Sequence, residues 1–151
     1  MLREAFSERL KEAMRARDAG TVSAVRLILA GLKDRDIAAR GTGNNEGLGD
    51  REILQLLQGM VKQRRESIVL YEQGNRIDLA DKERSEIAVI ESFLPTQMGD
   101  EEIAAAAKTA IAETGAAGVK DMGKVMAALR ERHAGVIDMA RAGAVVKQLL
   151  G

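Results

Sequence analysis

The chain has 151 residues, no net charge, no cysteine and a single histidine. These counts exclude disulfides, thiol nucleophiles and zinc sites built from cysteine and histidine, and a net charge of zero gives no overall field of the kind that marks a nucleic-acid binder. Aromatic residues make up only 2% of the chain although 46% of it is hydrophobic, and a core of aliphatic side chains favours helices over sheets. We therefore expect an all-α protein.

No stretch of the chain is apolar over the roughly 18 residues that a membrane-spanning helix needs. The best candidate, residues 22–32, is interrupted by Arg26. We expect a soluble cytosolic protein with no membrane partner.

Helical spacing of apolar residues predicts four helices before the only proline. The first covers residues 2–17, and Met14 is expected on its buried face. A break follows, after which Thr21 is expected to cap the second helix. Arg26 on this second helix is interpreted as a structural arginine, and a charge that faces a partner is the alternative.

Residues 40–49 contain four glycines and two asparagines without an apolar period, which predicts a mobile loop. Asp50 is expected to cap the third helix, which should run to about Glu72 and stop at Gly74 in a left-handed conformation. Asp78 is expected to cap the fourth helix.

A short basic cluster lies on the third helix. It consists of Lys62, Arg64 and Arg65, with Glu66 beside them. We interpret it as a solvated face, and a contact with RNA phosphates is the sharper alternative.

The segment 92–102 contains the only proline of the chain and divides it. Pro95 lacks an N–H group and disfavours helical geometry at Leu94, so the fourth helix should end there. A new helix should begin at Gly99, with Glu102 reaching back to an uncapped N–H. We therefore expect an N-terminal subdomain of four helices, 1–96, and a C-terminal three-helix bundle, 97–151.

Three shorter helices are predicted beyond this segment. Small apolar residues line the first of them, which Gly115 and Gly118 should terminate. The second should open within residues 120–126, and the last should start near Asp138. In the last helix, the residues expected to be buried are Met139, Ala144, Val145 and Leu149.

Groups suited to catalysis are scarce. His133 is isolated near a helix end, where a histidine commonly complements the helix dipole. Three acidic pairs are expected on exposed faces with ordinary pKa values and no catalytic role: Asp34 with Asp36, Glu83 with Glu86, and Glu101 with Glu102. We predict no catalytic residue, no metal site and no cofactor.

Charge is unevenly distributed within the C-terminal subdomain. Residues 100–114 carry four acids and one base, a net charge of −3, and residues 115–151 carry six bases and three acids, a net charge of +3. The turn at 120–126 joins two lysines to Gly123, which could bring backbone and ammonium groups to a phosphate; tight helix packing at Gly123 is the alternative. The predicted RNA-binding residues are Lys120, Lys124, Arg130, Arg141 and Lys147.

Four segments carry a resemblance to a known family: VRLILA at 25–30, IAVIESFLPTQ at 87–97, MGDEEI at 98–103 and KDMGKVM at 120–126. With them the chain resembles the GatB/YqeY family from end to end, specifically its free-standing YqeY-like members. It departs from the family at Gly99, where a capping Ser or Thr is frequent, and at 137–140, where the last helix usually opens with Ala-Asp-Gly or Ala-Asp-Pro.

The resemblance implies two helical subdomains, the second similar to the tail domain of the B subunit of the tRNA-dependent amidotransferase, which helps to grip tRNA. It implies a tRNA-binding or amidotransferase-associated accessory module without an active site of its own. The implied partners are tRNA or other structured RNA, and amidotransferase or translation-related proteins. Participation in glutamine-dependent amide transfer, a carbon-nitrogen ligase activity with glutamine as amido-N-donor, is one alternative, and a protein-interaction module is another.

Overall fold

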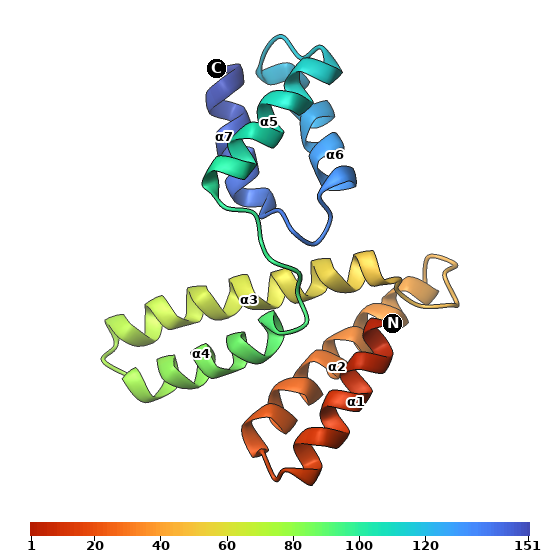
Figure 1. Cartoon of the computed structure of the whole chain (residues 1–151), viewed down its shortest axis with the longest axis vertical. Coiled ribbons are helices and arrows are strands. Elements are labelled where there is room, and N and C mark those ends of the chain that lie inside the picture. The colour runs from red at the N-terminus through yellow and green to blue at the C-terminus, as the bar shows by residue number, and fades with distance from the viewer. The chain divides into compact units, whose positions relative to one another are not determined.

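The computed structural model describes all 151 residues and confirms the all-α fold, with seven α-helices, one short 3₁₀ helix and no strand. The chain divides into two compact units, Met1–Leu94 and Pro95–Gly151 (Figure 1). The helices are α1 Leu2–Arg15, α2 Ala19–Arg40, α3 Asp50–Gln73, α4 Ile77–Glu91, α5 Asp100–Thr114, η1 Val119–Asp121, α6 Met122–Arg132 and α7 Met139–Leu150. None of them combines the length and the apolar character that crossing a bilayer requires.

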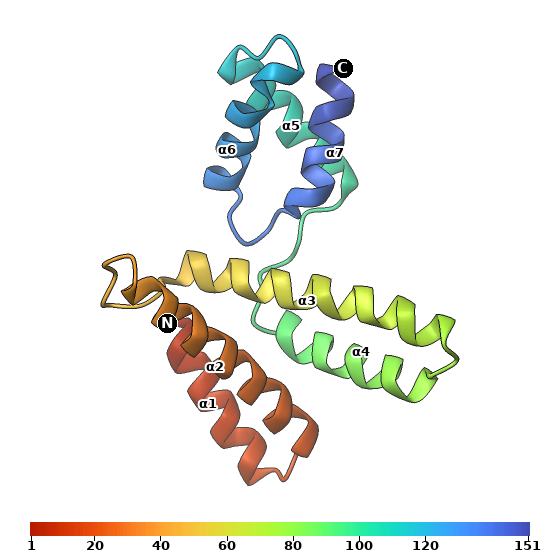
Figure 2. The same ribbon diagram turned by 180° about the vertical axis from the view of Figure 1, so that it is seen from behind.

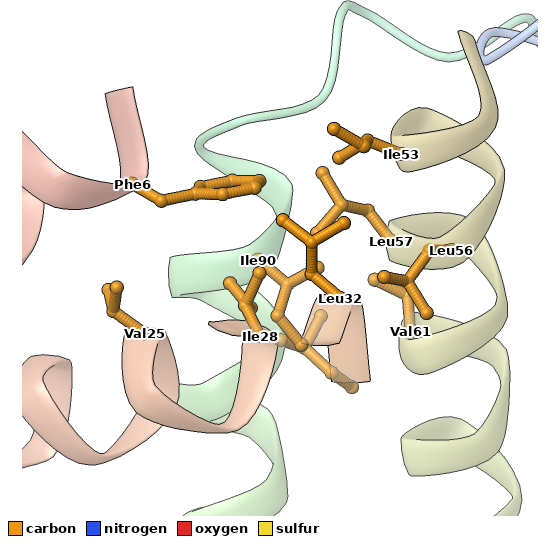
Figure 3. Close-up of a cluster of buried hydrophobic side chains, with 10 residues drawn as sticks. Phe6, Val25, Ile28, Leu32, Ile53, Leu56, Leu57, Val61 and Ile90 are labelled. Atoms are coloured by element: carbon orange, nitrogen blue, oxygen red, sulfur yellow. The ribbon is translucent and has the colours of Figure 1, made fainter. Parts of the chain in front are cut away.

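The N-terminal unit consists of two antiparallel helical hairpins, α1 with α2 and α3 with α4 (Figures 1 and 2). Its core is aliphatic except for Phe6, whose ring meets that of Phe93 edge to face with 4.8 Å between the centroids. All four helices contribute fully buried side chains to this core (Figure 3), among them Phe6, Val25, Ile28, Ile53, Leu57 and Ile90.

The C-terminal unit packs α5, α6 and α7 around smaller side chains. Ala107 and Ala110 of α5 are buried, so the neighbouring helices can approach closely. The predicted face of α7 is partly wrong, since Ala144 and Leu149 are exposed while Ala142 and Val146 are buried. Arg141, Lys147 and Gln148 lie on the side of α7 opposite Ala142 and Val146, so the helical period does mark the buried face, and the expected set was offset from it.

Three of the predicted N-caps are wrong. Asp18 caps α2 instead of Thr21, since its carboxylate accepts hydrogen bonds from the Thr21 backbone N (3.1 Å) and Oγ1 (2.6 Å). Gly49 and Arg76 occupy the N-cap positions of α3 and α4. Asp50 and Asp78 lie in the first turns instead, where an acid is also favoured because it faces the positive end of the helix dipole.

Two further local predictions are corrected. Gly74 ends α3 with φ −84°, and the left-handed residue is Asn75 with φ 56°. Asn tolerates this conformation better than other non-glycine residues, so it takes the role expected of the glycine. Met14, expected to be buried, is 54% exposed.

The helix boundaries around Pro95 follow the prediction. After α4, the backbone N–H groups of Phe93 and Leu94 donate to the carbonyls of Ile90 and Glu91, three residues back, and the helix does not continue. Gly99 is the N-cap of α5, and the Glu102 carboxylate accepts a hydrogen bond from its backbone N at 3.4 Å. Gly115, in the left-handed conformation with φ 67°, ends α5 as expected.

Candidate nucleic-acid interface

The corner between α5 and α6 is formed by a short glycine-containing turn. After Gly115, the chain passes through Gly118 in an extended conformation and enters η1. The Asp121 carboxylate accepts a hydrogen bond from the Ala117 backbone N at 3.0 Å, which ties the turn to the start of α6. Lys120 in η1 and Lys124 in the first turn of α6 are exposed, four residues apart along nearly continuous helical backbone. Residues with this spacing share one side of a helix.

Gly123 lies in the first turn of α6, and its surroundings decide between the two interpretations of this glycine. A Cβ added there would meet no atom within 4 Å, so tight helix packing does not require it. Within the C-terminal unit, Gly143 of α7 does lie against a neighbouring helix, and the Cε atoms of Met126 and Met122 would lie 3.6 and 3.7 Å from an added Cβ. The backbone at Gly123 is therefore open to approach from solvent.

Ion pairs within the C-terminal unit use several of its basic residues. Arg132 of α6 pairs with Glu113, and Arg141 of α7 pairs with Asp100, so two arginines are held by acids of α5. Arg130 also has an interaction partner. The three lysines of η1, α6 and α7, which are Lys120, Lys124 and Lys147, make no ion pair, and all three are exposed.

The five predicted RNA-binding residues do not form one patch. Lys147 lies in the last turn of α7, and the end of α7 lies at the same end of the unit as η1 and the start of α6 (Figures 1 and 2). Arg130 lies near the end of α6 and Arg141 near the start of α7, so both are close to the connection between these two helices and away from the three lysines. The structure therefore brings the three lysines to one end of the unit and separates the two arginines from them.

Two members of the basic cluster of α3, Arg64 and Arg65, pair with acids of α4. Arg64 Nε donates to Glu86 Oε2 at 3.0 Å and lies 3.8 Å from Glu83 Oε2, and the Arg64 side chain is only 13% exposed. Arg65 pairs with Glu91 at 3.0 Å. The interpretation as a solvated face is therefore wrong for Arg64, and the Glu83–Glu86 pair is not an exposed one. These charges join α3 to α4.

Asp36 also departs from the expectation of an ordinary exposed acid. Its carboxylate accepts a bidentate pair of hydrogen bonds from the Arg3 guanidinium at 2.8 and 2.9 Å, and a third from the Leu48 backbone N at 2.9 Å. The Arg3 guanidinium and the Leu48 N–H lower the pKa of Asp36 to about 2. Nothing in the local sequence indicates this, because Arg3 lies 33 positions away.

His133 is the C-cap residue of α6, and its backbone N donates to the Leu129 carbonyl at 3.0 Å. Its side chain is not part of any group of three or more His, Asp or Glu residues that could hold a metal ion. The candidate site is thus a binding surface made of the η1–α6 corner and the end of α7.

Comparison with known proteins identifies the chain's relatives. Residues 3–150 match the family model described as Yqey-like protein. Two similar curated proteins are both named altered inheritance of mitochondria protein 41, mitochondrial. The one from Lachancea thermotolerans is 34% identical over 85 residues, which cover 56% of this chain and 43% of the relative. The one from Candida glabrata is 35% identical over 85 residues, which cover 56% of this chain and 45% of the relative.

A third relative, an uncharacterized protein of Schizosaccharomyces pombe, is 24% identical over 94 residues, which cover 62% of this chain and 72% of the relative. The matched part of the chain thus spans less than half the length of the first two relatives.

The cytosolic location expected from the sequence is contradicted by these relatives, because the names of the first two are those of mitochondrial proteins. That expectation depended on composition and on the lack of a long apolar run. A helical protein of this composition is equally compatible with other aqueous compartments, so these features do not identify one.

Proposed function

The chain belongs to the YqeY-like family, and from this premise we propose that it is a binding module whose C-terminal unit contacts the phosphates of structured RNA, with tRNA as the first candidate. The observation that carries the proposal is the group of three exposed lysines without ion pairs at one end of that unit. The amidotransferase tail that the sequence resembles grips tRNA, which is the reason for naming tRNA first.

The chemistry of the lysines supports phosphate contacts. A lysine ammonium is a compact point charge with three donors, and phosphate neutralisation by lysine releases counterions without reading base identity. The open backbone at Gly123 and Gly118 allows a phosphate or ribose to approach the corner between Lys120 and Lys124. Because the unit has no net charge, binding should depend on this local group and weaken steeply as salt rises.

The test is a filter-binding titration of the full chain with bulk tRNA at a series of salt concentrations. Three phosphate contacts predict a slope of log affinity against log salt of about −2 to −3. Lys120→Ala combined with Lys124→Ala should weaken binding by about tenfold at low salt and make the slope shallower by about 2. Both changes should be similar for unrelated RNA sequences, since phosphate contacts carry little sequence information.

Lys82→Ala combined with Lys108→Ala is the matched control, because it removes two exposed lysines without ion pairs from other surfaces. It should leave the affinity and the slope near those of the wild type. Equal losses in both double variants would contradict the proposed site, and no affinity for bulk tRNA at low salt would contradict the function.

Binding without bond formation is part of the proposal. The purified chain incubated with misacylated tRNA, ATP and glutamine should give no amide product above the blank. Turnover in this assay would contradict the proposal of a pure binding module and would indicate an enzyme that takes part in amide transfer.

A further inference from the structure

A shallow groove runs along the outer side of the α1–α2 hairpin. It is lined by the end of α1 and one face of α2: Met14, Arg17, Ala19, Val22, Ser23, Arg26 and Leu27. We propose that this groove binds an acidic amphipathic helix of a partner protein. The proposal concerns the N-terminal unit and is independent of the RNA-binding surface.

The position of the groove follows from the register of α2. Its lining residues recur at intervals of three and four positions from Ala19 to Leu27, which places them on one face of the helix. The opposite face of α2 carries Val25 and Ile28, which are fully buried in the core. The groove face is therefore not needed to hold the unit together.

The groove combines an apolar surface with positive charge. Met14 is 54% exposed and Leu27 is 43% exposed. Arg17 and Arg26 make no ion pair, and no carboxylate lines the groove. The acid nearest in sequence, Asp18, uses its carboxylate to cap α2. A ligand that offers apolar side chains between carboxylates would match both features.

Arg17 is held in a conformation that a non-glycine residue seldom adopts, with φ 55°. Every other left-handed position of the chain is occupied by a residue suited to it: Gly43, Gly47, Asn75, Gly115 and Gly135. This conformation ends α1, since the backbone N–H groups of Arg17 and Asp18 donate to the carbonyls of Met14 and Ala13, and glycine would fit it without steric cost. Here the arginine places a cation at the end of the groove.

The same features favour a protein helix over the other anionic partners. RNA would satisfy the arginines but would leave Met14 and Leu27 exposed to water. A bilayer surface is broad, whereas this groove is confined to the end of α1 and one face of α2. An amphipathic helix fits such a groove, because its apolar residues at three- and four-residue spacing enter it while flanking carboxylates reach the bidentate guanidinium groups.

The test measures fluorescence anisotropy of a labelled 18-residue peptide of Leu, Glu and Ala with leucines at three- and four-residue spacing, titrated with the full chain. We expect saturable binding that a shuffled peptide of equal composition lacks. Leu27→Glu should weaken it by about tenfold or more, since it replaces an apolar contact by a repelling charge. Arg17→Gly should weaken binding several-fold while raising the melting temperature by a few degrees.

Leu70→Glu is the matched control, since Leu70 is 67% exposed on α3 and lies outside the groove. It should bind the peptide as the wild type does. No saturable binding, or an equal loss in Leu70→Glu and Leu27→Glu, would overturn the proposal.

Three further results would assign the groove to another occupant and overturn the proposal. The first is displacement of the peptide by bulk tRNA in the Lys120→Ala, Lys124→Ala variant. The second is sedimentation with phosphatidylcholine–phosphatidylserine vesicles that Leu27→Glu abolishes. The third is a dimer in size-exclusion chromatography that Leu27→Glu dissociates.

Discussion

At the scale of single residues, Asp36 shows how one carboxylate can organise a loop. It holds Arg3 at the start of α1 and the Leu48 backbone N at the end of the loop, while Arg3 also donates to the Leu48 carbonyl at 2.9 Å. Gly47, with φ 90°, passes beside this pair so closely that an added Cβ would lie 2.8 Å from both Arg3 Nη2 and Asp36 Oδ1. The end of the loop is thus tied to both helices of the first hairpin.

This network predicts a pH-dependent contribution to stability. The pKa of Asp36 in the folded chain is about 2, below its usual value near 4 in an unfolded chain. Its contribution is therefore fully present above about pH 4 and is lost as pH falls towards 2. Asp36→Asn should lower the free energy of unfolding by about 1 to 2 kcal/mol at neutral pH, because it weakens three hydrogen bonds at a half-buried site.

The measurement is urea denaturation followed by tyrosine fluorescence between pH 2 and pH 7. Tyr71 is the only tyrosine and the chain has no tryptophan, so this signal reports on the N-terminal unit. The control is Asp34→Asn, which changes an exposed neighbour of the same kind and should keep the acid-dependent loss. An acid-dependent loss in Asp36→Asn equal to that of the wild type would contradict the role given to Asp36.

At the scale of the elements, α3 and α4 are joined by apolar contacts and by Arg64. Its guanidinium lies near two half-buried carboxylates, Glu86 and Glu83, and also donates to the Met60 carbonyl at 3.3 Å. Removal of the arginine leaves these carboxylates half-buried without their cation, and an uncompensated charge costs more than a lost surface ion pair.

Arg64→Ala should therefore lower the free energy of unfolding of the N-terminal unit by about 2 kcal/mol, measured by urea denaturation at pH 7 with Tyr71 fluorescence. Lys62→Ala on the same helix removes an exposed base without an ion pair and should stay within about 0.5 kcal/mol of the wild type. If the two variants had the same free energy of unfolding, Arg64 would contribute no more to stability than an exposed surface charge, which would contradict the role given to it here.

At the scale of the whole molecule, the connection between the two units is short. Phe93 and Leu94 pack against the core of the N-terminal unit. On the other side, Gln97 Nε2 donates to the Gly135 carbonyl at 2.7 Å and the Met98 backbone N donates to the Val136 carbonyl at 2.8 Å. Only Pro95 and Thr96 lie between these attachments, so few backbone dihedral angles connect the units.

Pro95→Ala should therefore change the small-angle scattering profile. The substitution frees one φ angle, restores an N–H donor and permits helical geometry at Leu94, which lets α4 extend by a few residues. Circular dichroism at 222 nm should show the added helix. Thr96→Ala changes the neighbouring exposed residue without these effects and should leave the profile unchanged. An unchanged scattering profile for Pro95→Ala would show that packing, and not the proline, restricts the backbone conformation of the connection.

Much of the fold was determined by short-range features of the sequence. The spacing of apolar residues predicted all seven α-helices, Pro95 predicted the end of α4 near Leu94, and Gly99 with Glu102 predicted the start of α5. These features act within about one helical turn, so they can be evaluated without knowing what the rest of the chain does. The resemblance carried by the four segments likewise identified the family, which residues 3–150 confirm.

The partners of the charged residues were decided only by the tertiary structure. Arg64 meets Glu86 22 positions away, Asp36 meets Arg3 33 positions away, and Arg141 meets Asp100 41 positions away. Helix periodicity places a charge on a face but does not tell which other helix lies against it. The packing of the helices therefore determined which bases are used in ion pairs and which, such as Lys120 and Lys124, remain exposed without one.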